Sequence, residues 1–412
     1  MFTHPSRVWL LAAVAGFASS TFSGARAQSL DQLEAELARH PALDALQYRS
    51  DADRERATAA HALPDPVISL GINNLPVFDP VFDRFLPTNK AVGVRQQFPS
   101  AALRNAQSSG ANNRAAQTDA ARDWQYAQLR AELRISLIER ARIREQRRLA
   151  LARREKYAEL TDVIQNEIDA GRPALFRLAQ VDVERADIDR ALAELDAENA
   201  DIDARLVDLI GAVPDTDAPM PVVAEWTGEA GAFHAVRIAQ ASVGVADAGV
   251  DQAAAAYKPE WGVQLTYQQR ENGRGGMGST FAGDDWVSGM VTFTVPIWAE
   301  KSQAPRLRAA KADRSAARAL SMAAARRAAS DYAGYLATRR AAVESLAVLK
   351  QKIHSLEDQR DALLTVYESG AGDYSPIIDG ELAILLLQSQ TAAEAARRDG
   401  ATERLNALLV TS

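Results

Sequence analysis

The chain has 412 residues, of which 47% are hydrophobic and 25% are charged, and its formal net charge is −7. This composition is typical of a folded protein and excludes a disordered chain, and the acidic balance argues against a nucleic-acid partner. The sequence has no cysteine, which excludes disulfides, thiolate metal sites, cysteine nucleophiles and lipid attachment through an N-terminal cysteine. Five scattered histidines predict no histidine-built metal centre.

The first 27 residues predict a secretory signal peptide. Arg7 precedes an apolar run over residues 8–18, and Ala25-Arg26-Ala27 forms a small-x-small cleavage site. An N-terminal anchor helix is the alternative, but the run is too short to cross a bilayer core of about 30 Å. We therefore expect the mature protein to begin near residue 28, outside the cytoplasm. No later stretch of 18 apolar residues predicts a transmembrane helix.

Four short segments have the alternation of β-strands, with apolar side chains on one face and polar or small ones on the other. They are residues 65–74, 90–98, 261–271 and 286–296. Their length is that of a tilted membrane-spanning strand, although a soluble sheet with one wet face has the same period. The connections 75–89 and 272–285 are long and rich in Gly, Pro and Asp, and resemble external loops. Aromatic residues near the segment ends lie where an interfacial girdle would be: Trp261, Tyr267 and Trp286.

Two proline-free stretches predict very long helices. They are rich in Ala, Arg, Glu, Leu and Gln, which are good helix formers, and a helix of about 65 residues is on the order of 100 Å long. The predicted helices cover about 100–170, 174–211, 302–369 and 376–410. Residues that are apolar except for Asn199 and Arg360 recur in steps of three and four. They are Ile188, Leu192, Leu195, Asn199, Ile202, Leu206 and Leu209, and Ala342, Leu346, Leu349, Ile353, Leu356, Arg360, Leu363 and Tyr367. This spacing indicates coiled-coil seams, with a simple helical bundle as the alternative.

Landmarks that recur at a nearly constant distance indicate an internal duplication. They are Pro64 and Pro259, Pro99 and Pro296, and Gly171 and Gly370, at offsets of 195, 197 and 199 residues. The predicted organisation is a signal peptide (1–27), a first repeat (28–213), a linker rich in Pro and Asp (214–222) and a second repeat (223–412).

The number of predicted strands has a physical consequence. Four strands cannot close a barrel, and an open edge in lipid leaves backbone groups unpaired at several kcal/mol each. The smallest single-chain barrels have about eight strands. If the strands span a membrane, several copies must share one barrel, with the long helices packed below it as a tube.

The order of several motifs resembles the TolC-type outer-membrane efflux protein family over nearly the whole mature chain. These motifs are Leu63-Pro64, the run from Gly93 to Pro99 followed by Leu103-Arg104, Val295-Pro296, Tyr367-Glu368-Ser369-Gly370 and Ile377-Ile378-Asp379. The resemblance implies a fold that is mostly α with membrane β. In a homotrimer, each subunit would contribute four transmembrane strands to one shared barrel and duplicated coiled-coil hairpins to a tunnel.

The resemblance also implies a location and partners. The barrel would lie in the lipid of a Gram-negative outer membrane and the tunnel in the periplasm, where its end meets a membrane-fusion adaptor and an inner-membrane pump of the resistance-nodulation-division type. The chain would be a passive export duct for metal ions or small toxic molecules, with no cofactor and no catalytic residue. Asn73-Asn74-Leu75-Pro76 resembles members that serve heavy-metal pumps.

Four residues match functional positions of the family. Gly171 and Gly370 match the helix-to-helix turns where adaptor tips dock, since a tight reversal needs a residue that tolerates positive φ. An ordinary helix cap is the alternative for both. Tyr367 matches a tyrosine that holds the tip closed, or else completes the seam. Asp379 matches an acid of the ring that narrows the entrance, where symmetry-related carboxylates favour cations, or else is a solvated helix charge.

The sequence departs from the family at the gate. The companion acid of the ring falls on Pro376, and the Arg–Asp pair that locks the tip falls on Gly372 and Arg177. A pair between Arg177 and Asp373 is the substitute that the sequence suggests.

No enzyme signature competes with this interpretation. The chain has no nucleotide-binding glycine loop, no Gly-x-Ser-x-Gly elbow and no HExxH motif. The alternative function is a periplasmic coiled-coil scaffold or adaptor protein without a channel of its own. An adaptor has one helical hairpin with flanking β-rich domains, whereas this chain predicts two hairpins and little other β-structure.

Overall fold

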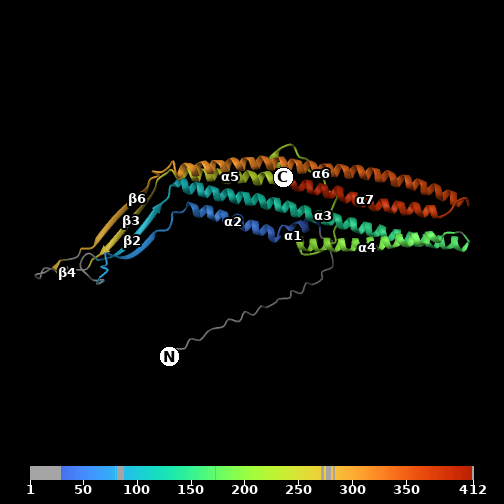
Figure 1. Cartoon of the computed structure of the whole chain (residues 1–412), viewed down its shortest axis with the longest axis horizontal. Coiled ribbons are helices and arrows are strands. Elements are labelled where there is room, and N and C mark those ends of the chain that lie inside the picture. Colours follow the sequence, from blue (N-terminus) through green and yellow to red (C-terminus); the bar gives the residue numbers. More distant parts are fainter. Residues whose placement is uncertain are drawn as a thin grey trace, which may run out of the picture.

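The structure is a computed structural model that describes residues 29–78, 80, 88–171, 173–270, 273–274, 280–281 and 284–410. The predicted signal peptide (1–27) lies outside the described residues, and so do parts of the two predicted loops. The molecule is a long rod of helices with a β-sheet at one end, and the sheet is inclined to the axis of the rod (Figure 1).

The two halves of the chain have the same order of main elements. The first half contains α1 (Leu30–Leu37), α2 (Pro41–His61), β1 (Val67–Asn73), β2 (Asn89–Phe98), α3 (Ala101–Asp169) and α4 (Leu175–Ile210). The second half contains the short 3₁₀ helix η1 (Ala230–Ala232), α5 (His234–Ala255), β3 (Glu260–Gln269), β4 (Gly273–Arg274), β5 (Thr280–Phe281), β6 (Trp286–Thr294), α6 (Gln303–Glu368) and α7 (Ser375–Leu408). In each half two long strands therefore stand between a shorter helix and a very long one, with the two-residue strands β4 and β5 added in the second half.

The main sheet joins strands from both halves. Its order is β1-β2-β3-β6, and every neighbouring pair is antiparallel. The central pair connects the two halves, with Val94 opposite Leu265. β4 and β5 form a separate two-stranded ribbon, which the sequence analysis did not predict. The predicted fold class, mostly α with a small set of strands, is confirmed.

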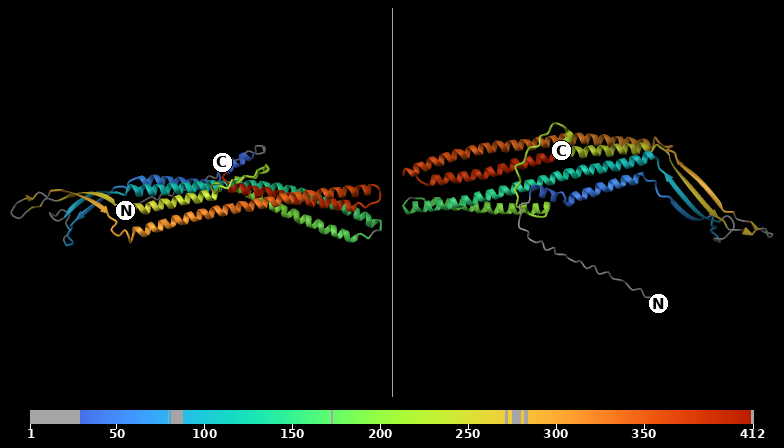
Figure 2. Two further views of the ribbon diagram at one scale, coloured as in Figure 1. Left: turned by 90° about the horizontal axis from the view of Figure 1, so that it is seen from above. Right: turned by 180° about the vertical axis from the view of Figure 1, so that it is seen from behind.

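The helices form a single curved layer of four columns (Figures 1 and 2). α3, which has 69 residues and is about 100 Å long, packs against α2 and α4 on one side and against α5 and α7 on the other. α6 packs against α5 and α7 and forms an outer edge of the layer in Figure 1.

Local sequence signals explain where several helices begin. Ser29 forms a capping box with Gln32 at the start of α1. Pro41 occupies the first turn of α2, where its missing N–H costs no hydrogen bond. The Ser100 hydroxyl accepts a hydrogen bond from the backbone N–H of Leu103 at the start of α3. These caps fix the entry of α1, α2 and α3 into the helical layer.

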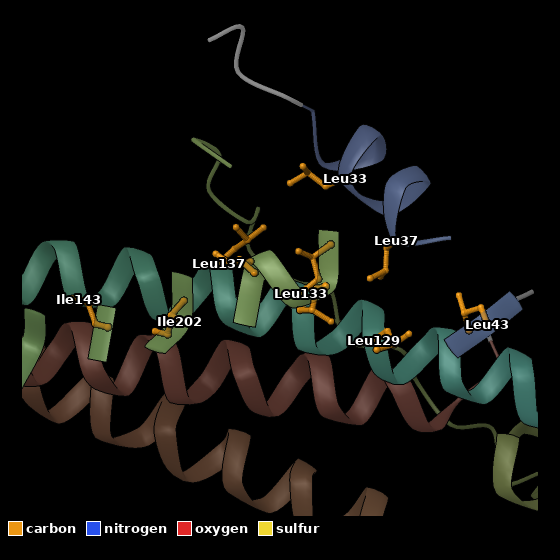
Figure 3. Packing of buried hydrophobic residues seen from close by; sticks show 10 residues of the cluster. Leu33, Leu37, Leu43, Leu129, Leu133, Leu137, Ile143 and Ile202 are labelled. Carbon is orange, nitrogen blue, oxygen red and sulfur yellow. The ribbon is translucent and has the colours of Figure 1, made fainter. Parts of the chain in front are cut away.

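The core lies between the helical columns in three clusters. The largest joins α1, α2, α3 and α4, where Leu33 and Leu37 of α1 lie over Leu133 and Leu137 of α3 (Figure 3). A second joins α3, α4 and α7 near the helical tip, and a third surrounds Phe233 between α5, α6 and α7. The predicted seam residues are all buried or half-buried except Tyr367, which is exposed. The predicted seams therefore face neighbouring helices, and the second seam ends exposed at Tyr367.

Candidate functional site

One face of the main sheet is apolar and exposed. The register places Val92 opposite both Leu70 and Tyr267, and it places Val263 opposite Val291. Leu70 is 78% exposed. Exposed apolar residues of this face come from all four strands: Ile68, Leu70, Ile72, Val92, Val94, Trp261, Val263, Leu265, Tyr267, Val287, Val291 and Phe293. An apolar surface spread over a whole sheet face marks an interaction or membrane surface in a protein.

The opposite face of the sheet is polar or small. It carries Ser69, Gly93, Gln264 and Thr292, among others. Gly93 and Gly262 keep this face close-packed, because a Cβ at Gly93 would lie 2.6 Å from Ser69 Oγ. Alternation between one apolar and one polar face is the pattern of strands that separate lipid from water.

The predicted aromatic girdle is only partly found. Trp261 stacks on Phe98, with ring centroids 4.1 Å apart, and lies on the apolar face with Tyr267. Trp286 is different, because the register pairs it with Gln268 on the polar face, where the guanidinium of Arg270 lies 3.3 Å from its ring centroid. Its place in the predicted girdle is wrong, since period-two alternation assigns it to the other face.

Both outer strands of the sheet have an open edge. β1 pairs only with β2, and β6 only with β3, among the described residues. The unpaired backbone N–H and C=O groups of such edges are templates for pairing with another chain.

Two glycine turns close the opposite end of the rod. Gly171 ends α3 with φ of +81°, and Gly370 ends α6 with φ of +75°. The N–H of Ala371 donates to the carbonyl of Val366 at 3.2 Å, so this turn satisfies a terminal carbonyl of α6. A Cβ at either glycine would meet open space. Glycine is therefore required by the backbone conformation, and the exposed backbone is accessible to a partner.

Tyr367 is held by a ring contact across the second turn. Its ring centroid lies 5.1 Å from that of Tyr374, with planes inclined by 48°. Tyr374 packs in turn against the tip cluster that contains Ile164 and Ile378. Tyr367 is thus exposed at the end of its seam and packs on Tyr374 across its own turn.

A carboxylate of α3 joins both turns. Glu167 Oε2 lies 3.0 Å from Arg177 Nη1 of α4, and Glu167 Oε1 accepts a hydrogen bond from the Ser375 hydroxyl at 3.5 Å. Ser375 is the first residue of α7 and is buried. Among the described residues, the ion pair of Arg177 is with Glu167 and not with Asp373, which lies exposed in the α6–α7 turn. The pairing that the sequence suggested is therefore not formed here.

Asp379 lies beside this junction. It lines a small pocket with Tyr157, Ile164 and Arg177, and the residue as a whole is exposed. Partial burial raises the pKa of the Asp379 carboxyl, and the charge of Arg177 opposes that rise. The pocket therefore places one acid of α7 against the α3–α4 hairpin.

An ionic contact ties α7 to α3. Lys156 Nζ lies 2.9 Å from both Glu159 Oε2 and Glu381 Oε2. Hydrogen bonds to Glu159, which has the larger effect, and to Glu381 raise the pKa of Lys156. This cation therefore stays charged at neutral pH. Glu381 is thus engaged in a contact between helices.

The sequence analysis missed four features of the tip. Glu167 contacts Ser375, which is far away in the sequence, and Tyr374 contacts Tyr367 across a turn. No local sequence pattern reveals either contact. Leu175 and Phe176 are each largely exposed at the start of α4. The sequence did contain a signal for Leu175 and Phe176. This Leu-Phe pair follows Pro173 and Ala174 and puts two large apolar side chains in the first turn of a helix, where polar residues are usual.

None of the described helices combines the length and apolar character needed to cross a bilayer. No group of three or more His, Cys, Asp or Glu residues that could hold a metal ion is found in the described part of the chain.

The chain resembles known proteins in its structure. No family model and no curated protein matches the sequence. Solved structures match over 92% of this chain: CusC, in a study of folding and transmembrane channel formation (13% identity, 91% of that chain, TM-score 0.75), and the outer membrane protein VceC of Vibrio cholerae (16%, 95%, 0.73). The open state of the MtrE outer membrane channel of Neisseria gonorrhoeae also matches (17% identity, 88% of that chain, TM-score 0.74). Together with the exposed apolar sheet and the long helical hairpins, these matches show that the chain has the fold of outer-membrane channel proteins of the TolC type.

Proposed function

We propose that the protein is the outer-membrane channel subunit of a tripartite efflux pump. The observation that carries this proposal is a four-stranded sheet with one exposed apolar face and two open edges, at the end of a helical rod about 100 Å long. The apolar face would contact outer-membrane lipid, the polar face would line a water-filled lumen, and the rod would extend through the periplasm. The chain would act as a passive duct, and the partner pump would supply the energy.

Closure of the sheet requires other copies of the chain. A strand edge exposed to hydrocarbon leaves backbone groups unpaired at several kcal/mol each. Pairing β6 of one copy with β1 of the next removes every edge, and three copies would give a barrel of about twelve strands, within the range of known barrels. A homotrimer is therefore the assembly that we propose, in the outer membrane of a Gram-negative bacterium.

This proposed pairing of β6 with β1 assumes that the two halves of the chain are repeats of one unit. We assign residues 28–213 and 223–412 to these repeats, because the main elements follow in the same order in both. The β2–β3 contact within a subunit would then recur as a β6–β1 contact between subunits.

The helical tip would receive a periplasmic membrane-fusion adaptor. The backbone at Gly171 and Gly370 is accessible, and Leu175 with Phe176 presents exposed apolar side chains beside it. Apolar side chains near an accessible backbone turn suit the docking of a helical hairpin tip. An inner-membrane pump of the resistance-nodulation-division type would complete the assembly, with metal ions or small toxic molecules as cargo.

The gate would lie at the same end of the tube. Tyr367 would close it through its contact with Tyr374, and Arg177 would do so through Glu167, with Asp373 exposed in the neighbouring turn. Asp379 would place one carboxylate per subunit near the entrance, where a ring of three would favour cations.

Conductance tests the proposal most simply. The purified mature protein added to a planar bilayer should give discrete conductance steps. Glu167→Gln, which removes the charge that pairs with Arg177, should raise the fraction of time that the channel is open. The matched variant Glu145→Gln, at a more exposed position on the same helix, should not. A silent, monomeric preparation that stays soluble without detergent would contradict the proposal.

A further inference from the structure

The apolar surface of the sheet continues past the end of β6. Val295, Ile297 and Trp298 follow the strand, and all three are exposed, with Ile297 at 76% and Trp298 at 71%. Val295 directly follows β6 and has the same parity as Phe293, which lies on the apolar face. A turn held by the N–H of Ile297 and the carbonyl of Val295, 2.9 Å apart, then directs the chain away from the sheet.

This surface is specific to the second half of the chain. α3 begins at Ala101, directly after Pro99 and Ser100, whereas α6 begins at Gln303, with six residues between Pro296 and the helix. The additional residues form a turn in which the N–H groups of Lys301 and Ser302 both donate to the carbonyl of Trp298 at 3.0 Å. An ordered turn therefore presents two large apolar side chains at a place where the first half has Ser100 and Ala101.

The residues that follow are strongly cationic. Residues 296–312 contain four cations and one anion, in a chain whose net charge is −7. Lys301, Arg306 and Arg308 are exposed, and no ion pair among the described residues engages any of the three. By contrast, Arg104 near the start of α3 donates to the carbonyl of His61 at 2.7 Å. The cations after β6 are thus available to an external anion.

We propose that the segment from Val295 to Arg308 is an interfacial anchor that binds the anionic phospholipid headgroups of the leaflet nearest the helices. Ile297 and Trp298 would insert at the level of the headgroups, where Trp is favoured, and Lys301, Arg306 and Arg308 would contact lipid phosphates. The anchor would fix the height of the barrel in the bilayer, at the point where the rod leaves it. This inference depends on the proposed membrane location of the sheet.

Charge and continuity favour lipid over another protein as the occupant. The segment extends the face that we assign to lipid, and its three free cations match the phosphates of a lipid surface. The competing occupant is the neighbouring copy, whose residues before β1 would lie near this segment in a closed barrel. The experiment below separates the two.

Site-directed fluorescence tests the anchor, because the chain has no native cysteine. Single variants Ile297→Cys, Leu265→Cys and His354→Cys would be labelled with a small fluorophore and reconstituted as the full mature protein. The vesicles would contain phosphatidylethanolamine and phosphatidylglycerol, with nitroxide either on the headgroup or deep in the acyl chain. We expect headgroup nitroxide to quench position 297 most, acyl-chain nitroxide to quench position 265 most, and neither to quench position 354.

The outcomes distinguish this inference from the proposed function. In one outcome, position 265 is quenched, whereas position 297 is unquenched and becomes shielded on assembly. This result would show that the neighbouring copy covers the segment, and it would overturn the anchor alone. Position 265 unquenched would overturn the membrane location itself.

A second arm tests the cations. In the variant K301Q/R306Q/R308Q, the preference of position 297 for quenching by headgroup-labelled phosphatidylglycerol over phosphatidylcholine should fall by about fivefold per cation removed. The variant R339Q/R340Q on the middle of α6 should leave that preference unchanged. An unchanged preference in the first variant would overturn the role of the cations.

Discussion

Helices α3 and α6 occupy corresponding places in the two halves and yet are buried very differently. They have 69 and 66 residues, and both are rich in alanine and arginine. Sixteen residues of α3 are buried, whereas only four residues of α6 are: Ala328, Tyr332, Ala342 and Leu349. The difference does not arise from helix propensity, since both helices form over their full length.

Position in the helical layer explains the difference. α3 is an inner column with neighbours on both sides, whereas α6 packs only against α5, α7 and the short η1 among the described elements. Leu320 and Met322 of α6 are largely exposed, which is the state of a helix whose second neighbour is absent. The comparison teaches that one chain is complete around α3 and incomplete around α6, as the trimer that we propose would require.

The largest contrast is expected at the ion pairs of the two helices. Arg134 of α3 lies 2.5 Å from Glu34 and 3.4 Å from Glu403, and all three side chains are mostly buried. Arg134→Ala leaves two buried carboxylates without their cation and should lower the free energy of unfolding by about 3–5 kcal/mol. Arg360→Ala in α6 breaks a pair with the exposed Asp361 and should change it by less than about 1 kcal/mol. Guanidinium unfolding in detergent, followed by circular dichroism, measures both, and equal midpoints would remove the contrast.

Truncation of apolar side chains should show the same difference between α3 and α6, with the next largest effect on stability. Leu133 of α3 is 0% exposed, whereas Leu320 of α6 is 68% exposed. Leu133→Ala creates a cavity and should cost about 2–5 kcal/mol, and Leu320→Ala should cost less than about 0.5 kcal/mol in an isolated subunit. The same unfolding assay on monomer and on assembled protein sharpens the comparison. A larger loss for Leu320→Ala only after assembly would support burial of α6 by a neighbour, and a large loss in the monomer would contradict its edge position.

Glycine replacements should have opposite signs within α6 and at its end. Gly370 has φ of +75°, so Gly370→Ala is strained although its Cβ would meet nothing, and the loss should be about 1–2 kcal/mol. Gly171→Ala should behave alike. Gly334 lies inside α6 with open space at its Cβ, so Gly334→Ala should stabilise the helix by about 0.5–1 kcal/mol. Thermal unfolding checks the signs, and stabilisation by Gly370→Ala would contradict the observed turn.

The smallest effect concerns pH. Burial raises the pKa of the Glu403 carboxyl, and the charge and hydrogen bond of Arg134 oppose that rise. The pKa of Glu403 is higher in the folded protein than in the unfolded chain. Stability is therefore lost as the pH rises from the pKa of the unfolded chain to that of the folded protein. The stability of the wild type minus that of Glu403→Gln should therefore be largest in acid, fall as the pH rises, and level off at neutral pH. Unfolding of both proteins from pH 4 to 8 measures the difference, and a difference that grows with pH would have the wrong sign.

Sequence patterns located the seams but could not say which long helix is interior. Steps of three and four residues placed Ile202 and Leu349 correctly because they report which face of a helix packs. They cannot report how many neighbours a helix has, so the exposure of Leu320 was not foreseen. The Glu167–Ser375 contact joins residues 208 positions apart, which local spacing does not encode. Trp286 was misplaced because its position at a segment end was considered without its parity in the strand.

The central claim is that three copies close one barrel by pairing β6 of one subunit with β1 of the next. The duplication transfers the observed pair of Val94 and Leu265 to Val291 of one copy and Leu70 of its neighbour. Since β1 and β6 lie at opposite edges of the sheet within one chain, a disulfide between Leu70→Cys and Val291→Cys can form only between copies. Oxidation of L70C/V291C in membranes should give covalent dimers and trimers, and the register-shifted L70C/V287C should not. Absence of cross-links, or equal cross-linking of both variants, would contradict the shared barrel.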